Sequence, residues 1–200
     1  MKTNNEIMQD ALNTLRGKWG LAVGTYLVVI LVSAAIQVIA ERAPLASVGS
    51  IIIGGPLALG IAIFALSIAR EKEDTRFEQL FEGFQNFVTA LTAYLLMILF
   101  IFLWTLLLII PGLIAAISYS MTFFILADNP EMAPLEALNT SKNMMYGYKM
   151  KYAGILLRIF GLAILCIFTL GIGFLFLAPY IQVLNALFYE EIKNNPIEKV

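Results

Sequence analysis

Four polar side chains stand out because each lies inside an apolar segment of this 200-residue chain. Arg158 is the only charged residue well inside such a segment, while Thr122, Gln182 and Asn185 lie in two others. At about 1.5 Å of rise per helical residue, all four lie about 8–12 Å from the charged residue nearest the end of their segment. Guanidinium, amide and hydroxyl groups donate the hydrogen bonds that suit a phosphate. The pattern predicts a pocket for an anionic headgroup or phosphorylated ligand. Alternatively, Arg158 extends to the inner headgroups.

The residues that carry most enzyme chemistry are missing from this pattern. The chain has no histidine and one cysteine, Cys166, so the commonest general base and the usual transition-metal ligands are absent. Ser118, Ser120 and Thr122 carry hydroxyls, but no histidine or buried acid is available to activate them. No Walker, Rossmann, G-x-S-x-G or H-E-x-x-H pattern occurs. We therefore expect neither catalysis, nor a cofactor, nor a metal site.

The segments that hold these residues are long enough to cross a membrane. Apolar residues make up 60% of the chain and charged residues 14%, whereas a soluble domain has about 25% charged residues. A membrane-spanning helix needs about 20 apolar residues, and lipid requires every backbone group to be satisfied within its own segment. We therefore predict an all-α membrane protein. Breaks at Pro111-Gly112 and at Gly171 divide the charge-free stretches into six spans, at about 20–40, 51–69, 88–110, 113–127, 152–170 and 174–189.

The positive charges indicate how these spans are oriented. Of the thirteen Lys and Arg residues, Arg42 alone falls on the side opposite to the others when six spans are counted. The positive-inside rule then places both termini in the cytoplasm. The sequence thus predicts a multi-pass protein of a bacterial inner membrane, with membrane lipid as its partner, possible contact with another membrane protein, and no nucleic acid.

A polar sequence motif recurs along the chain and indicates three repeated units. Residues 10–19 read DALNTLRGKW and residues 136–149 read EALNTSKNMMYGYK. Each copy precedes a pair of spans, and TRFEQLFEGFQNF at 75–87 supplies a third unit. Capping-box spacing is found at Thr3 and Glu6, at Thr75 and Glu78, and at Asp128 and Glu131. The predicted units are about 1–70, 71–127 and 128–200, with Pro56, Pro111 and Pro179 at the head of each second span.

Each unit is expected to begin with an amphipathic helix on the cytoplasmic face, at the level of the lipid headgroups. In the first unit the apolar face comprises Ile7, Met8, Ala11, Leu12, Leu15 and Trp19, and in the second Phe77, Leu80, Phe81, Phe84 and Phe87. These helices either brace the bundle, or bind lipid or a partner. Gly20 and Gly24 form a G-x-x-x-G pattern that favours packing within the chain over a dimer face.

Several stretches resemble a bacterial integral-membrane family catalogued as domain of unknown function 975. The resemblance covers nearly the whole chain and is carried by GGPLALG (54–60), LFEGFQNF (80–87), the long stretch 103–149, TLGIGFLFLAPY (169–180) and FYEE (188–191). The family is in turn distantly similar to the membrane part of glycerophosphodiesterases, which has no catalytic site. Gly147-Tyr148-Lys149 stands where the family has Gly-His-Lys. The resemblance implies a membrane fold and brings no activity with it.

Two classes of function fit these observations. The first is a non-catalytic membrane protein that binds lipid or supports a membrane partner. The second is a small permease, or the substrate-binding subunit of a larger transporter, because six spans in about 200 residues also suit that role. The outer turns are short, which argues against an external ligand site. The sequence leaves the ligand and the oligomeric state open.

Overall fold

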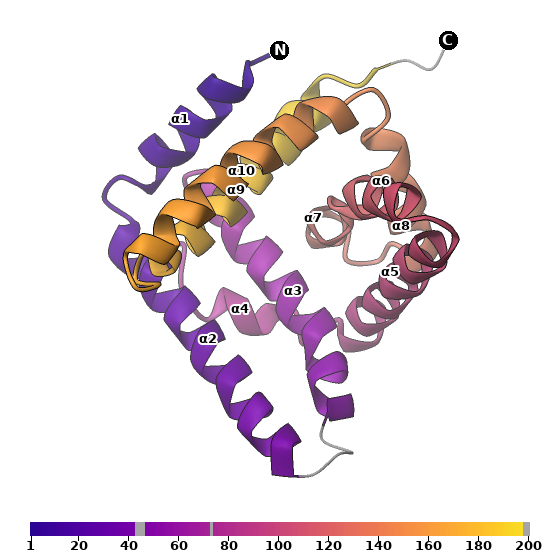
Figure 1. The fold of residues 1–200 in the computed structure, drawn as a ribbon, viewed down its shortest axis with the longest axis horizontal. Helices are drawn as coiled ribbons and strands as arrows, with labels where there is room; N and C mark the ends of the chain where they lie inside the picture. The colour runs from indigo at the N-terminus through magenta and orange to yellow at the C-terminus, as the bar shows by residue number, and fades with distance from the viewer. Residues whose placement is uncertain (43–46, 73, 198–200) are drawn as a thin grey trace.

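The computed structural model describes residues 1–42, 47–72 and 74–197, and every regular element in them is a helix (Figure 1). Three helical hairpins, α2–α3, α5–α6/α7 and α9–α10, are preceded by the shorter helices α1, α4 and α8. The helices are α1 (Asn4–Leu15), α2 (Trp19–Arg42), α3 (Ser47–Ala69), α4 (Gln79–Glu82), α5 (Phe87–Leu107), α6 (Ile109–Tyr119), α7 (Thr122–Asp128), α8 (Pro134–Met144), α9 (Lys149–Phe168) and α10 (Gly173–Asn194).

Four stretches among the described residues are long and apolar enough to cross a membrane: Gly49–Ala69, Phe87–Leu107, Ile109–Asp128 and Lys149–Phe168. The pair α1 and α2 adds a fifth if the two helices, which meet at 94°, are counted as one broken span. The predicted sixth segment, α10, is outside this set and carries Gln182, Asn185 and Glu190 within its length. The structure thus has several candidate membrane helices.

The hairpin turn after α5 lies three residues before the predicted break. Leu108 has an extended backbone conformation, and α6 begins at Ile109 instead of after Gly112. Pro111 then occupies the first turn of α6, where a missing N–H costs little because first-turn N–H groups have no helical partner. Gly112 serves a different purpose, because a Cβ built there would lie 2.1 Å from Oγ1 of Thr105 on α5. Proline therefore starts the second helix of this hairpin, and glycine lets the two helices approach.

The fourth predicted span is broken at Ser120-Met121 into α6 and α7. Ser118 and Thr122 donate their hydroxyls to the carbonyls of Ile114 and Tyr119, as expected for hydroxyls within apolar helices. The hydroxyl of Ser141 on α8 donates to the carbonyl of Ser118 at 2.8 Å and accepts from the N–H of Met121 at 3.2 Å. A buried serine of a different helix thus satisfies backbone groups that the break exposes.

The helices that precede the hairpins pack in a cyclic order. α1 packs on α9 and α10 of the last hairpin, α4 on α3 of the first, and α8 on α5, α6 and α7 of the second. The loops after α1 and α8 both contain a glycine with positive φ, Gly17 at 81° and Gly147 at 77°. Each helix therefore packs on the hairpin that precedes it in this order, and the threefold repeat itself stays a prediction.

Two of the three predicted capping boxes are wrong. Thr3 and Glu6 form one at the start of α1, with both reciprocal hydrogen bonds present. The hydroxyl of Thr75 instead donates to the carbonyl of Lys72, and α4 is a single turn without a side-chain cap. Asp128 ends α7, and α8 begins only at Pro134. The spacing of Asp128 and Glu131 did not predict a cap, because the Asp128 carboxylate forms ion pairs with Arg70 and Lys193.

α1 lies lengthwise against the α9–α10 hairpin, which differs from the expectation of a helix lying flat across upright spans (Figure 1). The N–H of Lys2 donates to Glu191 at one end, and the ring of Trp19, just beyond α1, lies 5.9 Å from that of Phe176 at the other. Since α2 leaves at 94° to α1, the first and last hairpins are not parallel. Three residues of α1, Ile7, Ala11 and Leu15, are buried, while Leu12 on the same predicted apolar face is exposed.

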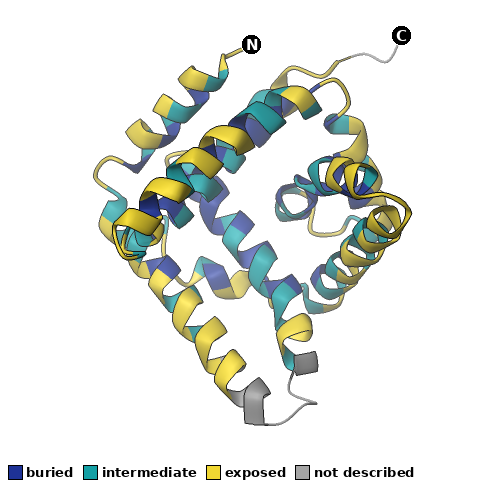
Figure 2. Ribbon diagram, in the orientation of Figure 1, coloured by how far each residue is buried: buried dark blue, intermediate teal, exposed yellow. Residues whose placement is uncertain are grey.

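The core lies where the second helices of the hairpins meet. α3 contacts both α7 and α10, and the ring of Phe124 on α7 stacks on Tyr189 of α10 at 5.7 Å. Figure 2 shows buried faces along α3 and α10, and mainly exposed residues along α2 and the outer sides of α5 and α9. The second helices thus form the centre of the molecule, and the first helices present apolar residues outward.

Candidate functional site

The structure does not join the four residues singled out in the sequence into one hydrogen-bonded site. Thr122 is fully buried and donates to the backbone of Tyr119. Asn185 accepts a hydrogen bond from the hydroxyl of Tyr152 at 3.1 Å, and Gln182 is half-buried on the same helix. Arg158 is exposed, and its partners lie on α1. The amide stripe therefore serves the α9–α10 interface, at least at Asn185, and Arg158 belongs to a different surface.

Arg158 lies between α9 and the start of α1. One of its Nη atoms donates to Oδ1 of Asn5 at 2.6 Å and lies 3.9 Å from the sulfur of Met8. The Asn4 side chain connects the same end of α1 to α9, because its amide donates a hydrogen bond to the carbonyl of Lys151 at 3.0 Å. Among the described residues, no carboxylate lies within ion-pair distance of Arg158. The guanidinium is thus positioned by a neutral side chain, and its charge is not balanced by an acid.

Two adjoining hollows flank this arginine. The first, of about 490 Å³, lies between α1, α9 and α10 and is almost entirely apolar. The second, of about 400 Å³, is lined by Arg158, Asn5, Gly161 and three residues that also line the first: Met8, Gln9 and Leu162. The shared residues show that the two hollows adjoin, and Arg158 lines the second of them and not the first. We call the two hollows together the α1–α9 groove.

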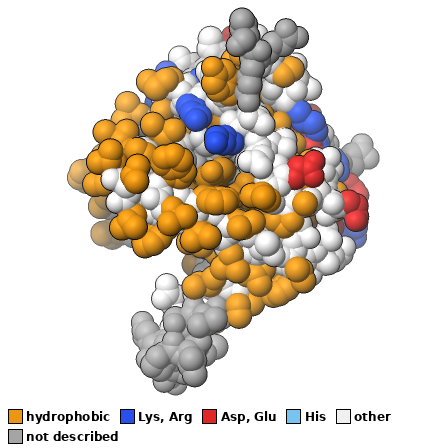
Figure 3. Space-filling view, turned by 90° about the vertical axis from the view of Figure 1, so that its right-hand side faces the viewer, with side chains coloured by type: hydrophobic (Ala, Val, Ile, Leu, Met, Phe, Trp, Pro, Cys, Tyr) orange, Lys and Arg blue, Asp and Glu red, His pale blue; other side chains and the backbone are white. Residues whose placement is uncertain are grey.

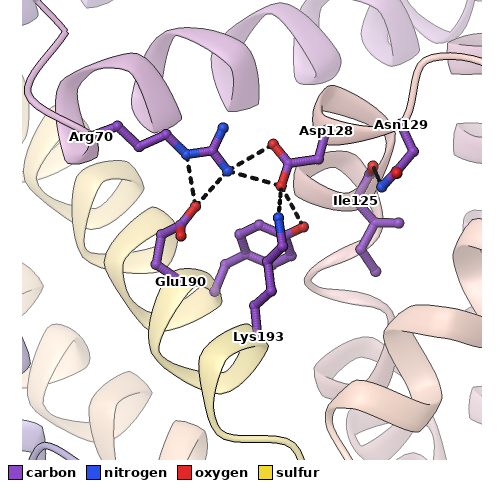
Figure 4. A network of polar contacts seen from close by, with 7 residues as sticks. Arg70, Ile125, Asp128, Asn129, Glu190 and Lys193 are labelled. Carbon is purple, nitrogen blue, oxygen red and sulfur yellow. Dashed lines mark hydrogen bonds and ion pairs between the residues drawn. The ribbon is translucent and has the colours of Figure 1, made fainter.

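A second polar cluster lies where α3, α7 and α10 end, and the sequence analysis did not identify it (Figure 4). Asp128 accepts from Arg70 at 2.8 Å, from Lys193 at 2.5 Å and from the hydroxyl of Tyr189 at 2.9 Å. Arg70 also donates to Glu190 at 2.5–2.8 Å. The sequence does contain a pattern that points to this cluster. Each predicted unit has two apolar segments, and Arg70, Asp128 and Glu190 are the first charged residues after the second segment of their units.

The charges in this cluster hold one another in place. The Asp128 side chain is 9% exposed and has three donors around it, so its charge is compensated. Burial lowers the pKa of Arg70, but hydrogen bonds from its guanidinium to Glu190 and Asp128 outweigh this and raise the pKa above its ordinary value. The ion pairs of this cluster connect the ends of α3, α7 and α10. We therefore assign the cluster a role in stabilising the fold.

Replacing Asp128 with asparagine is expected to destabilise the protein by about 2–3 kcal/mol, because Arg70 and Lys193 lose the carboxylate they share in a partly buried position. Glu190→Gln is the matched control, since Glu190 is more exposed and, within the described part of the chain, forms an ion pair with Arg70 alone. We expect it to cost no more than about 1 kcal/mol. Thermal unfolding in mild detergent measures both, and equal losses would contradict the central role of Asp128.

Comparison with known proteins places the chain in a family. The model of a family described as a protein of unknown function, DUF975, matches residues 1–118 and 105–196, which together cover nearly the whole chain. The chain belongs to the DUF975 family. No curated protein and no solved structure matches it, and the more distant similarity to glycerophosphodiesterases is not shown by these comparisons.

The family's characteristic stretches now have a structural explanation. GGPLALG lies in α3 and LFEGFQNF in α4 and the start of α5, and these helices meet at glycines. A Cβ at Gly60 would lie 1.9 Å from the carbonyl oxygen of Leu80, and one at Gly83 would lie 2.1 Å from that of Pro56. In this chain the two stretches therefore serve backbone-to-backbone packing between α3 and α4.

Proposed function

We propose that this DUF975 protein is a non-catalytic module of a bacterial inner membrane that binds lipid. In this proposal, six membrane helices form three repeated hairpins, each preceded by a helix at the cytoplasmic headgroup region, and both termini lie in the cytoplasm. A role in supporting another membrane protein is compatible with the same surface. The proposal rests on the outward-facing apolar residues, on the distribution of charge and on the absence of catalytic groups from the sequence.

The observation that carries the proposal is the extent of the exposed apolar surface. Large apolar side chains are exposed along α2, α5, α6 and α9, including consecutive residues from Leu106 to Ile110 and from Phe102 to Trp104. Figure 3 shows hydrophobic side chains over much of one face, with charged side chains gathered towards its upper part and one edge. Soluble proteins rarely expose contiguous apolar patches above a few hundred Å². Such a surface is suited to contact with acyl chains.

The non-catalytic part of the proposal is supported by what the polar groups do. The chain has no histidine, and the most buried carboxylate of the α3–α7–α10 cluster, Asp128, is engaged by three donors. Hydroxyls that could act as nucleophiles, such as Ser118 and Thr122, donate to helix carbonyls. These groups are held in structural hydrogen bonds, so the exposed apolar surface is the feature that remains to be assigned a function.

The experiment combines fractionation, labelling and native mass spectrometry in a Cys166→Ser background. The protein is expected to remain in the membrane pellet after a carbonate wash. Asn139→Cys and Asn194→Cys, both at exposed positions, are expected to react with an impermeant maleimide in inverted vesicles and not in intact cells. A native mass spectrum from mild detergent is expected to show retained phospholipid.

Each alternative has its own result in this experiment. Stoichiometric recovery of a transporter ATPase subunit in the same spectrum would favour the transporter-subunit alternative. Recovery of the protein in the soluble fraction, or labelling of Asn194→Cys in intact cells, would contradict the proposal.

A further inference from the structure

The α1–α9 groove has the two-part shape of an amphiphile. Its longer part is walled by apolar residues of α1, α9 and α10 and by the first residue of α2: Met8, Leu12, Trp19, Leu165, Phe176 and Leu177. It is a hollow of about 490 Å³ that is open to the molecular surface. The hydroxyl of Tyr180 donates to the carbonyl of Met8 at 3.3 Å, so a backbone acceptor in the wall of the groove has a partner. What remains is a slot suited to a hydrocarbon chain.

The second part of the groove adds polar side chains to apolar ones. Arg158, Asn5 and Gln9 line it together with Gly161, and it adjoins the apolar part through Met8 and Leu162. Asn5 accepts one N–H of Arg158, and a guanidinium carries five N–H donors in a planar fork. The contrast with Arg70 is clear, because Arg70 is paired with two carboxylates, whereas Arg158 has none within reach among the described residues.

We propose that the α1–α9 groove binds one anionic phospholipid, with its phosphate on Arg158 and an acyl chain in the apolar slot. This proposal rests on the proposed function, and it names the lipid class and the place where the lipid binds. Charge complementarity selects an anion at Arg158, and the adjoining apolar slot selects an anion with a hydrocarbon chain. An Arg fork holds a phosphate through two parallel hydrogen bonds that Lys cannot reproduce. Asn5 therefore acts as a positioning residue, because it orients the guanidinium without neutralising it.

The test measures lipid retention by native mass spectrometry on purified protein in mild detergent. Phosphatidylglycerol, phosphatidylcholine and glycerol 3-phosphate are titrated separately against the wild type. One phosphatidylglycerol is expected to be retained, with an apparent affinity about tenfold or more above that of phosphatidylcholine, as expected for a charge-assisted hydrogen bond. Glycerol 3-phosphate, which offers the same phosphate without a chain, is expected to bind far more weakly.

Variants at Arg158 and Gly161 test the charge and the free space of the part of the groove that would hold the phosphate. Arg158→Gln is expected to abolish the preference for phosphatidylglycerol, and Arg158→Lys to lose most of it. Arg76→Gln removes the same charge from an exposed position outside the groove and should keep the preference. A Cβ at Gly161 would meet no atom within 4 Å, so Gly161→Phe fills the groove without displacing backbone and should reduce retention, whereas Gly161→Ala should not.

The outcomes distinguish this proposal from the more general one. If Arg158→Lys and Arg158→Gln keep the full preference while their melting temperatures in detergent match the wild type, the site is not at Arg158 and the inference fails. If glycerol 3-phosphate binds as tightly as phosphatidylglycerol, the apolar slot has no role and the inference also fails. In both cases a protein that stays in the membrane pellet and retains lipid unselectively still satisfies the proposed function.

Discussion

Replacing Gly60 with alanine is expected to lower the melting temperature in mild detergent by about 5–10 °C, which corresponds to about 2–3 kcal/mol for a chain of this length. The added Cβ would lie 1.9 Å from the carbonyl oxygen of Leu80 and 3.0 Å from its Cα. Both are backbone atoms, so no rotamer change can relieve the overlap. α4 would have to move away from α3, and Leu80, the buried residue of α4, would lose its packing.

The same contact is made from the other side by Gly83. Its added Cβ would lie 2.1 Å from the carbonyl oxygen of Pro56 and 2.5 Å from the backbone nitrogen of Gly60. Gly83→Ala is therefore expected to match Gly60→Ala, and the double variant should cost less than the sum of the two, because both remove one interface.

Two glycines of α2 provide matched controls. Gly20 and Gly24 would place a Cβ with no atom within 4 Å, so alanine there should be neutral or stabilise the helix by about 0.5–1 kcal/mol. Because no atom lies within 4 Å of a Cβ at either glycine, the expectation that this G-x-x-x-G pattern serves packing within the chain is wrong. A melting temperature of Gly60→Ala equal to that of Gly24→Ala would contradict the close approach of α3 and α4.

The sequence predicted the position of a helix where residues within that helix determine its ends. Charge-free length located the hairpins, and the turn before α10 falls where the glycines at 171 and 173 indicated. Of the three prolines expected at the head of a second span, only Pro111 lies in the first turn of its helix, whereas Pro56 and Pro179 lie inside α3 and α10. The break between α6 and α7 was not predictable from its own segment, because Ser141, twenty residues or more further along, satisfies the freed backbone groups. The length of α4 was misjudged for a related reason, since its single turn is fixed by glycine contacts with α3.

The candidate site shows a different limit of sequence reasoning. Distance along a helix gave similar depths for Arg158 and Asn185, but depth does not determine which side of a helix faces a neighbour. The structure directs Asn185 to Tyr152 and Arg158 to Asn5. α1 was expected at the level of the headgroups, either bracing the bundle or binding lipid or a partner, and its side chains were not considered as partners of Arg158. The role of Arg158 in binding an anion therefore stays a prediction, while its neighbours differ from those expected from the sequence.

The position of α1 also bears on how deeply the α9–α10 hairpin inserts. α1 runs along this hairpin and exposes Glu6, Gln9 and Asn13, which require water or headgroups. Its twelve residues are about 18 Å long, more than half of a hydrocarbon core of about 30 Å. An upright hairpin would carry this polar surface and Arg16 into the hydrocarbon. If α1 keeps this position in the membrane, we expect the hairpin to lie strongly inclined to the membrane normal.

The turn between α9 and α10 has two properties that suit a position within the membrane. Every backbone N–H from Thr169 to Leu175 donates to an acceptor within the hairpin, including the N–H of Gly173 to the hydroxyl of Thr169. With its N–H groups satisfied within the hairpin, this turn enters the membrane at a lower cost than a turn with free donors would. The tip is apolar as well as exposed, with Leu170 94% exposed and Phe168 80%. These features favour a turn that stays within the bilayer over one that emerges on the outer side, where the six-span prediction places it.

We therefore expect Leu170→Cys, in a Cys166→Ser background, to resist an impermeant maleimide in both intact cells and inverted vesicles, and to react fully after solubilisation in detergent. Arg16→Cys, whose loop follows α1 and lies near the same end of the hairpin, is expected to react in inverted vesicles, because positive residues favour the cytoplasmic side. Asn194→Cys, which the proposed topology places in the cytoplasm, is expected to react in inverted vesicles and not in intact cells. Reaction of Leu170→Cys in intact cells would mean that the hairpin crosses the bilayer completely. In that case α1 must leave the α9–α10 hairpin in the membrane, because Arg16 and Leu170 could not otherwise lie on opposite sides.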